Sequence, residues 1–131
     1  MAGIAYLDTS ALAKLILVEP GSWGLGDLAR DRPVVSSDLA RVELPRAIRR
    51  FEVGGRAAQL TDGLLRRIVL LKLDRATLTR AAEIEGAGLR SLDAIHLASA
   101  MSVPELEVFV TYDRRLASAA EEAGLRVEAP A

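Results

Sequence analysis

The segment IAYLDTSALAKL, residues Ile4–Leu15, is the most informative stretch of the chain for its fold. Ile4–Leu7 is a short apolar run, which is typical of a buried β-strand. Asp8 ends that run, and the apolar spacing that follows predicts a helix over Ala11–Val18 with Ser10 as its cap. The segment therefore indicates a strand, an acidic residue and a helix in immediate succession.

The same succession of strand and helix recurs toward the C-terminus. We predict strands at Val34–Ser36, Ile68–Leu73, Val108–Thr111 and Arg126–Glu128, and helices at Trp23–Arg30, from Ser37 or Asp38 to about Glu52, and at Arg56–Arg67, Thr77–Glu85, Leu92–Met101 and Asp113–Ala123. Strands that alternate with helices favour a parallel sheet covered by helices on both faces, so the expected fold class is α/β. We find no repeat or linker, and we expect one domain over residues 1–131 that ends in a loose tail at residues 129–131.

The composition excludes several kinds of chemistry. The chain has no cysteine, which rules out disulfides, zinc–thiolate sites and thiol catalysis. Its one histidine, His96, is too few for a histidine-rich metal site or for acid–base catalysis by two histidines. We interpret His96, one helical turn beyond Asp93, as an ordinary packed helix residue. The net charge of −1 provides no overall basic field for nucleic acid, although nearly all of the basic residues are arginine.

Half of the residues are hydrophobic and the mean hydropathy is +0.21, which is apolar for a chain of this size. We therefore expect part of the apolar surface to form an interface. Candidate surfaces lie on the first two predicted helices, with Leu15, Leu17, Val18, Trp23 and Leu28, unless core packing claims them. The start of the chain lacks the basic segment of a signal peptide, and no apolar stretch reaches membrane-spanning length. We expect a cytoplasmic protein without a membrane partner.

Four acidic residues stand where predicted elements begin or end, or between apolar neighbours. Asp8 follows the first strand, and Asp113 follows the strand Val108–Thr111 and opens a helix. Ligands of open parallel sheets bind beyond the carboxyl ends of the strands, so these two acids are expected to converge. Asp93 lies in the first turn of its helix, and Glu43 lies in mid-helix between two apolar residues.

Each acid also has a purely structural interpretation. The two acids that follow strands can cap helices, Asp93 is favoured by the helix dipole, and Glu43 can be a solvated surface residue. Taken singly, each structural interpretation is the better one, but the four together point to chemistry. Ser10 and Thr111 place hydroxyls beside two of the acids. They either support local structure or hydrogen-bond metal-bound water or phosphate.

Four segments resemble those of PIN-domain ribonucleases. They are YLDTSALAKL (Tyr6–Leu15), SSDLARVEL (Ser36–Leu44), LDAIHLASA (Leu92–Ala100) and VTYDRRL (Val110–Leu116). Each carries one of the four acids, and their order and spacing cover nearly the whole chain. Within the family, the short length and the third segment look most like VapC toxins.

The resemblance implies a three-layer α/β/α fold, RNA cleavage that depends on Mg²⁺ or Mn²⁺, dimerisation, and inhibition by a cognate antitoxin. Carboxylates without Cys or His clusters select such hard cations. We expect Asp8, Asp93 and Asp113 to bind the metal, and Glu43 to bind it directly or through a water. Pro45 lies inside the predicted helix and is expected to kink it. The kink would change the direction in which Glu43 points.

Three further points stay open in the sequence. Arg46, Arg49 and Arg50, beyond Glu43 on the same helix, are candidate RNA contacts, with a solvated basic face as the alternative. An aspartyl-nucleophile phosphatase would also carry an Asp at the end of its first strand, but it commonly needs a second acid where this chain has Ser10. A non-catalytic PIN-like scaffold would keep the fold without the chemistry.

Overall fold

Five parallel strands form one sheet in the computed structural model, which describes residues 3–51, 54–86 and 88–131. The sheet order is β3-β2-β1-β4-β5, and all four pairings are parallel. The strands are β1 Ile4–Leu7, β2 Val34–Ser37, β3 Val69–Leu71, β4 Leu106–Val110 and β5 Val127–Glu128. This sheet confirms the predicted α/β class.

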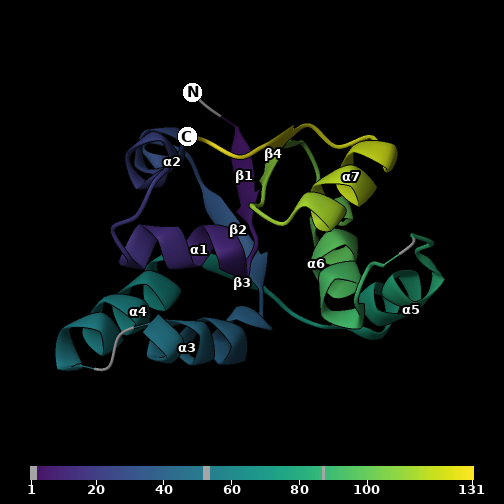
Figure 1. Ribbon diagram of the computed structural model, residues 1–131. Coiled ribbons are helices and arrows are strands. Elements are labelled where there is room, and N and C mark those ends of the chain that lie inside the picture. Colours follow the sequence, from purple (N-terminus) through teal and green to yellow (C-terminus); the bar gives the residue numbers. More distant parts are fainter. Residues whose placement is uncertain (1–2, 52–53, 87) are drawn as a thin grey trace.

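Helices cover both faces of the sheet (Figure 1). One face carries α1 Thr9–Ile16, α2 Ser22–Ala29, α3 Ala40–Phe51 and α4 Gly55–Arg67. The other carries α6 Ser91–Met101 and α7 Arg114–Glu122, with α5 Arg75–Glu83 packed against α6. The predicted three-layer arrangement is therefore confirmed. Within the described residues, no helix is both long and apolar enough to traverse a bilayer.

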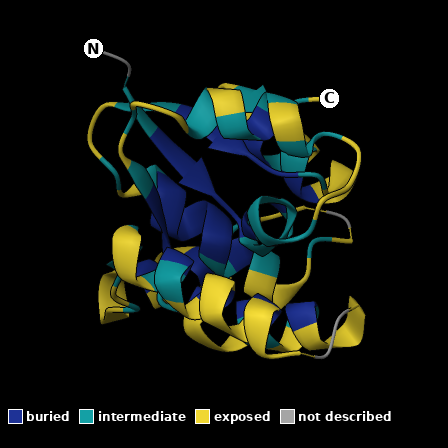
Figure 2. Ribbon diagram, turned by 90° about the vertical axis from the view of Figure 1, so that its left-hand side faces the viewer, coloured by how far each residue is buried: buried dark blue, intermediate teal, exposed yellow. Residues whose placement is uncertain are grey.

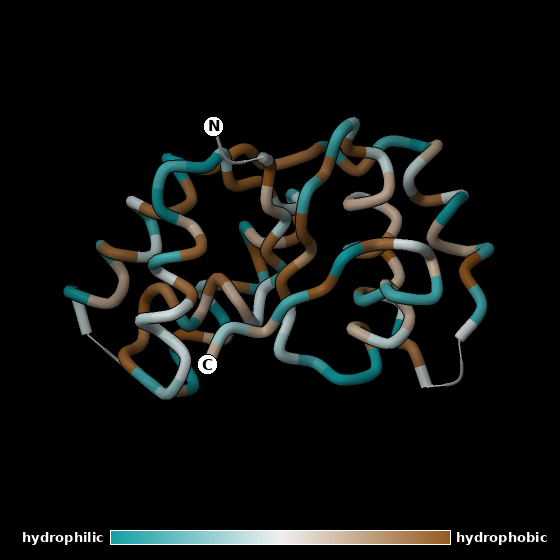
Figure 3. The backbone as a smooth tube through the Cα atoms, turned by 90° about the horizontal axis from the view of Figure 1, so that it is seen from above, coloured by the Kyte–Doolittle hydropathy of each residue, from teal (hydrophilic) through white to brown (hydrophobic). Residues whose placement is uncertain are grey.

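The central strands are buried on both faces because their side chains alternate. Ala5 and Leu7 point into the core formed with α1 to α4, whereas Tyr6 points into the opposite core with α6 and α7. β4 divides in the same way, with Phe109 on the side of Tyr6. Figure 2 shows the buried strands beneath helices with exposed outer faces, and Figure 3 shows hydrophobic stretches in the middle of the molecule. The two cores hold the carboxyl ends of β1 and β4 side by side.

These two strands also meet at the point where the chain changes direction across the sheet. β1 continues through α1 and α2 to β2 on one side, while β4 lies on its other side. In parallel sheets, a crevice opens beyond the strand ends at such a point. Asp8 follows β1 there, and the segment that leads to Asp113 follows β4.

Every predicted strand and helix is present, with bounds shifted by a few residues. Asp8 rather than Ser10 accepts the capping hydrogen bond of the first helix, so the prediction of Ser10 as the cap was wrong and the capping interpretation of Asp8 was correct. Glu43 lies in the first turn of α3 and not in mid-helix, since α3 begins at Ala40. Glu52, the predicted end of that helix, lies outside the described residues. The helix continues across Pro45.

The predicted loose tail is packed against α2. The hydroxyl of Tyr112 donates a hydrogen bond of 2.8 Å to the carbonyl of Pro130. Gly21 has a φ of 95°, and a Cβ there would lie 2.8 Å from the same carbonyl oxygen. A Cβ at Gly24 would lie 2.5 Å from the oxygen of Ala131. Glycine at these two positions makes room for the C-terminus.

Candidate functional site

Asp8 is the most buried of the four predicted acids, with 4% of its surface exposed. Its Oδ1 accepts hydrogen bonds from the Ala11 amide (3.0 Å) and the Ser10 hydroxyl (2.6 Å), and its Oδ2 accepts one from Thr111 (2.6 Å). Burial raises the pKa of Asp8, and these hydrogen bonds oppose the rise. A carboxylate has about four acceptor positions, so after these three bonds one position on Oδ2 remains for a cation.

Two hydroxyls connect the ends of β1 and β4. Ser10 donates to Asp8 and accepts a hydrogen bond from the Tyr112 amide at 3.0 Å. Thr111 donates to Asp8 and accepts one from the Asp113 amide at 3.1 Å. Both residues therefore hold Asp8 against the segment that follows β4. Contact of either hydroxyl with metal-bound water or phosphate stays a prediction.

Asp113 follows β4 and is exposed. Its Oδ1 accepts hydrogen bonds from the amides of Arg115 (2.9 Å) and Leu116 (3.0 Å), so Asp113 caps α7. The capping interpretation is therefore correct. Both capping hydrogen bonds end on Oδ1, so Oδ2 would be the oxygen that binds a metal ion.

Asp93, in the first turn of α6, responds to the charges of the other three acids. Its pKa is raised first by burial, and then by the negative charges of Asp113 and Asp8, with a further rise from Glu43. His96 opposes the rise. The other three acids, from separate segments, therefore lie near enough to Asp93 to oppose its ionisation, and the four are called the acidic cluster below.

Glu43 reaches this edge from α3, which lies on the opposite face of the sheet from α6. Its Oε1 accepts hydrogen bonds from the Thr9 hydroxyl and from Nε2 of His96, each at 2.7 Å. Burial raises the pKa of Glu43, but the hydrogen bond and charge of His96, together with Thr9, outweigh burial and bring the pKa below its usual value. Glu43 is thus held in its charged form.

Sequence reasoning missed the hydrogen bonds of two residues, His96 and Thr9. His96 is buried, as predicted for a packed helix residue, but its ring nitrogens also contact Tyr6 and Glu43. Thr9 carried no prediction at all. Its place beside Asp8 was the only signal in the sequence, and its partner Glu43 is 34 residues away. Such contacts follow from packing and not from spacing.

The donor set of the cluster fits a hard cation. Carboxylate oxygens are the ligands that Mg²⁺ and Mn²⁺ prefer. The raised pKa of Asp93 agrees, since neighbouring negative charges oppose its ionisation and a cation would offset them. Among the residues that the structure describes, however, no three acidic or histidine side chains are close enough to hold an ion as they stand. The metal contacts of Asp8, Glu43, Asp93 and Asp113 stay a prediction.

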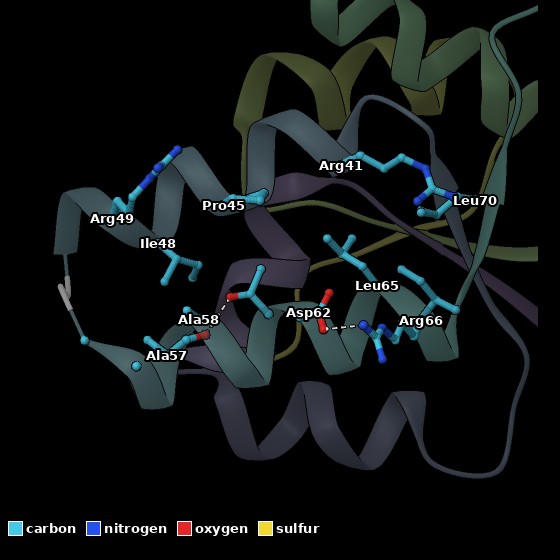
Figure 4. A pocket seen from close by; sticks show the side chains of 14 residues that line it. Arg41, Pro45, Ile48, Arg49, Ala57, Ala58, Asp62, Leu65, Arg66 and Leu70 are labelled. Atoms are coloured by element: carbon cyan, nitrogen blue, oxygen red, sulfur yellow. Dashed lines mark hydrogen bonds and ion pairs between the residues drawn. The ribbon is translucent and has the colours of Figure 1, made fainter.

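The predicted RNA contacts divide between two faces of α3, and all three are exposed. Arg46 and Arg50 follow Glu43 by three and seven residues, so they lie on its side of the helix. Arg49 instead lines a groove of about 970 Å³ between α3 and α4 (Figure 4). RNA contact by Arg46 and Arg50 stays compatible with the position of Glu43.

The groove is separate from the acidic cluster, since none of the four acids lines it. Ile48 and Leu65 project into the space between the two helices (Figure 4). The rest of its lining is mostly apolar and includes Pro45, Ala58, Ile68 and Leu70. Arg41 and Arg66 at its edge are paired with Asp38 and Asp62. The groove is therefore an apolar surface bordered by ion pairs and by Arg49.

A three-layer α/β fold with carboxylates gathered beyond β1 and β4 is the arrangement of a PIN domain. The chain belongs to the PIN domain family, whose family model matches residues 5–122. One relative is the ribonuclease VapC35 of Mycobacterium tuberculosis (strain H37Rv), which is 44% identical over 95% of this chain and 96% of its own length. The ribonuclease VapC47 of M. tuberculosis (strain CDC 1551) is 41% identical over the same shares of both chains.

Solved structures share the fold at much lower identity. M. tuberculosis VapC20, described as a Sarcin-Ricin loop cleaving toxin, has a TM-score of 0.72 and 17% identity over 96% of this chain and 99% of its own. VapBC2 from Rickettsia felis, bound to a DNA fragment from their promoter, has a TM-score of 0.70 and 15% identity over 98% and 99%. At these identities the likeness concerns the fold alone.

Proposed function

We propose that this chain is a metal-dependent endoribonuclease that hydrolyses RNA phosphodiester bonds with metal-activated water, as the toxin of a type II toxin–antitoxin pair. The observation that carries the proposal is that hydrogen bonds through Thr111 join Asp8 to the Asp113 segment and a hydrogen bond joins Glu43 to His96 on the helix of Asp93, while all three other acids raise the pKa of Asp93. Relatives named ribonuclease VapC, at 41–44% identity, support the same reaction class.

The residues of the cluster have distinct roles in this proposal. Asp8, Asp93 and Asp113 would hold Mg²⁺ or Mn²⁺, and Glu43 would bind it directly or through a water. When bound, the cation would supply a nucleophilic water at neutral pH and stabilise the leaving oxygen. Ser10 and Thr111 keep Asp8 in place. Arginines beside Glu43 would offset the repulsion between the acidic edge and RNA phosphates.

The surroundings of Asp8 disfavour an aspartyl-nucleophile phosphatase. Its oxygens accept three hydrogen bonds and the residue is 4% exposed, so attack on a phosphate ester is hindered. The second acid that such enzymes commonly need is replaced by Ser10, whose hydroxyl is bonded to Asp8. A non-catalytic scaffold gives no reason to place three acids where each opposes the ionisation of Asp93.

Two surfaces suit the expected partners. The apolar groove between α3 and α4 would take a segment of the antitoxin, since it lies on the helix that carries Glu43. Leu65→Glu should then abolish antitoxin binding, whereas Leu78→Glu on α5 should not.

Trp23 is 85% exposed and Val18 is 90% exposed, while the other candidates on α1 and α2 pack in the core. We propose that a homodimer covers these two side chains. Light scattering should give the mass of a dimer for the wild type and a lower mass for Trp23→Ala.

RNA cleavage in the presence of Mg²⁺, Mn²⁺ or EDTA tests the function directly. We expect cleavage of a defined RNA pool with either metal and none in EDTA. The buffer should match the pH and salt of the cytoplasm, where we propose that the protein acts. Asp8→Asn, Asp93→Asn and Asp113→Asn should each reduce cleavage by more than about a hundredfold, since even residues behind a metal ligand are worth about ten- to a hundredfold. Asp62→Asn, at an exposed acid paired with Arg66, is the control. Wild-type rates in all three site variants would refute the proposal, and covalent aspartyl labelling would favour the phosphatase.

A further inference from the structure

A line of hydrogen bonds runs from the buried core of the protein to the partly exposed Glu43. The Tyr6 hydroxyl lies 2.7 Å from Nδ1 of His96, and Nε2 of His96 lies 2.7 Å from Oε1 of Glu43. Thr9 adds a second hydrogen bond to the same oxygen at 2.7 Å. Strand β1, helix α6 and helix α3 each contribute one member of the line.

The hydrogens of this line have one consistent arrangement at Glu43. Nε2 of His96 carries a hydrogen, because a carboxylate oxygen only accepts. When the ring is neutral, Nδ1 accepts from the Tyr6 hydroxyl, and when the ring is protonated, Nδ1 donates to the Tyr6 oxygen. The Tyr6 hydroxyl suits both states, so the bond from His96 to Glu43 is kept in either.

The inner end of the line is rigid and the outer end is accessible. Tyr6 has no exposed surface, and its ring stacks on Phe109 with centroids 5.3 Å apart. The His96 ring meets Tyr6 edge-on at 5.9 Å. The exposed fraction is 3% for the His96 side chain and 22% for that of Glu43. The carboxylate at the edge of the sheet is therefore fixed from within the core.

All of the hydrogen bonds to Glu43 among the described residues end on Oε1. His96 also lies one helical turn beyond Asp93 on α6. Its bond to Glu43 therefore links the helix that carries Glu43 to the helix that carries Asp93. Both ring nitrogens of this buried histidine are hydrogen-bonded, and the partner of Nε2 is one of the proposed metal ligands.

We propose that His96, anchored by Tyr6, is a positioning residue that holds Oε1 of Glu43 inward and leaves Oε2 as the oxygen for the cation. The inference rests on the proposed metal site and deepens it, since it assigns the group that orients one ligand. Residues of this kind, placed behind a metal ligand, typically change metal affinity by about ten- to a hundredfold.

The test measures Mn²⁺ affinity by calorimetry on the full-length chain. His96→Phe fills the space without a donor, and His96→Asn places its amide near Nδ1 rather than Nε2. Both should weaken Mn²⁺ binding by about tenfold or more. His96→Gln, whose amide nitrogen can take the place of Nε2, should restore most of the affinity. Leu97→Ala, at a buried neighbour on α6, should lower the melting temperature and leave the affinity unchanged.

A purely structural role for His96 predicts a different pattern. Affinity that falls equally in His96→Gln, His96→Asn and Leu97→Ala, in step with lost stability, overturns the inference. So does a folded His96→Phe protein with wild-type affinity. Tyr6→Phe is the milder variant if His96→Phe does not fold, and it should weaken Mn²⁺ binding several-fold, whereas Tyr112→Phe should not.

The single histidine allows a readout without metal. Nitrogen-15 NMR of the histidine-labelled, metal-free chain should show a slowly exchanging hydrogen on Nε2, and a hydrogen found on Nδ1 alone overturns the inference. Wild-type protein that neither binds Mn²⁺ nor cleaves RNA overturns the proposed function together with this positioning role. Wild-type protein that does both, while the His96 variants bind Mn²⁺ equally well, overturns the positioning role alone.

Discussion

Nε2 of His96 lies 2.7 Å from Oε1 of Glu43 and joins two helices on opposite faces of the sheet. α3 carries Glu43, and α6 carries both His96 and Asp93. The hydrogen bond therefore connects the helices of two of the four acids, Glu43 and Asp93, across the sheet. The charges and contacts at the edge where β1 and β4 end therefore determine both metal binding and stability in the predictions below.

Loss of the Asp93 charge is expected to cost the metal-free protein no stability. The pKa of Asp93 is raised in the folded state, so the stability that it contributes below its unfolded pKa is lost as the pH rises through the folded value. Asp93→Asn cannot ionise and should melt no lower than wild type in EDTA at neutral pH. Circular-dichroism melts at several pH values check this, and the advantage of the variant should shrink in acid. A wild type that is clearly more stable at neutral pH would contradict it.

Mn²⁺ or Mg²⁺ is expected to raise the melting temperature of the wild type. A ligand that binds only the native state at a hundred times its Kd stabilises it by about 2.7 kcal/mol. Asp93→Asn should hardly respond, and Asp62→Asn should respond as the wild type does. Identical wild-type melting in EDTA and in excess Mn²⁺, without calorimetric binding, would rule out the convergent-carboxylate site.

Replacement of Asp113 by Ala is expected to destabilise the protein irrespective of metal. The side chain caps α7 through two amides, and the loss of such a cap costs about 0.5–2 kcal/mol. Asp113→Asn should lose less, since Asn is itself a good cap. Urea unfolding in EDTA compares the two variants. Equal stabilities would show that the capping bonds contribute nothing.

Thr111→Val is expected to destabilise the protein by about 1–3 kcal/mol, because it leaves the buried Asp8 carboxylate with one hydrogen bond fewer. The Asp113 amide also loses its partner. Thr79→Val, at an exposed threonine of α5, makes the same change in shape away from the site and should be nearly neutral. The measurement is the urea midpoint of each variant. If both valine variants unfold alike, Thr111 does not support Asp8.

Arg46→Gln and Arg50→Gln are expected to weaken RNA binding and to reduce its salt dependence. Each lost phosphate contact should lower the slope of log K against log salt by about 0.7 for a single strand. Arg49→Gln should have a smaller effect, since Arg49 lines the groove instead. Filter binding with the Asp113→Asn background avoids cleavage, and Arg80→Gln on α5 is the control. Equal slopes in all variants would leave these arginines as a solvated basic face.

The order of the elements and the place of the strand-end acids are determined by the sequence itself. A buried strand and an amphipathic helix differ in the period of their apolar residues, and that period is a local property. The local pattern therefore places Asp8 and Asp113 at strand ends without reference to any tertiary contact. The predicted α/β class follows from the same alternation.

Contacts between distant segments were decided only by the tertiary structure. The bond of His96 to Glu43 depends on how α3 and α6 pack across the sheet, and the docking of Pro130 depends on the space left at Gly21. Ser10 was predicted as a cap because its residue type suits one, yet Asp8 took that role and Ser10 bonded to it. Local residue type limits which hydrogen bonds a side chain can make, whereas the packing of both layers selects the partner.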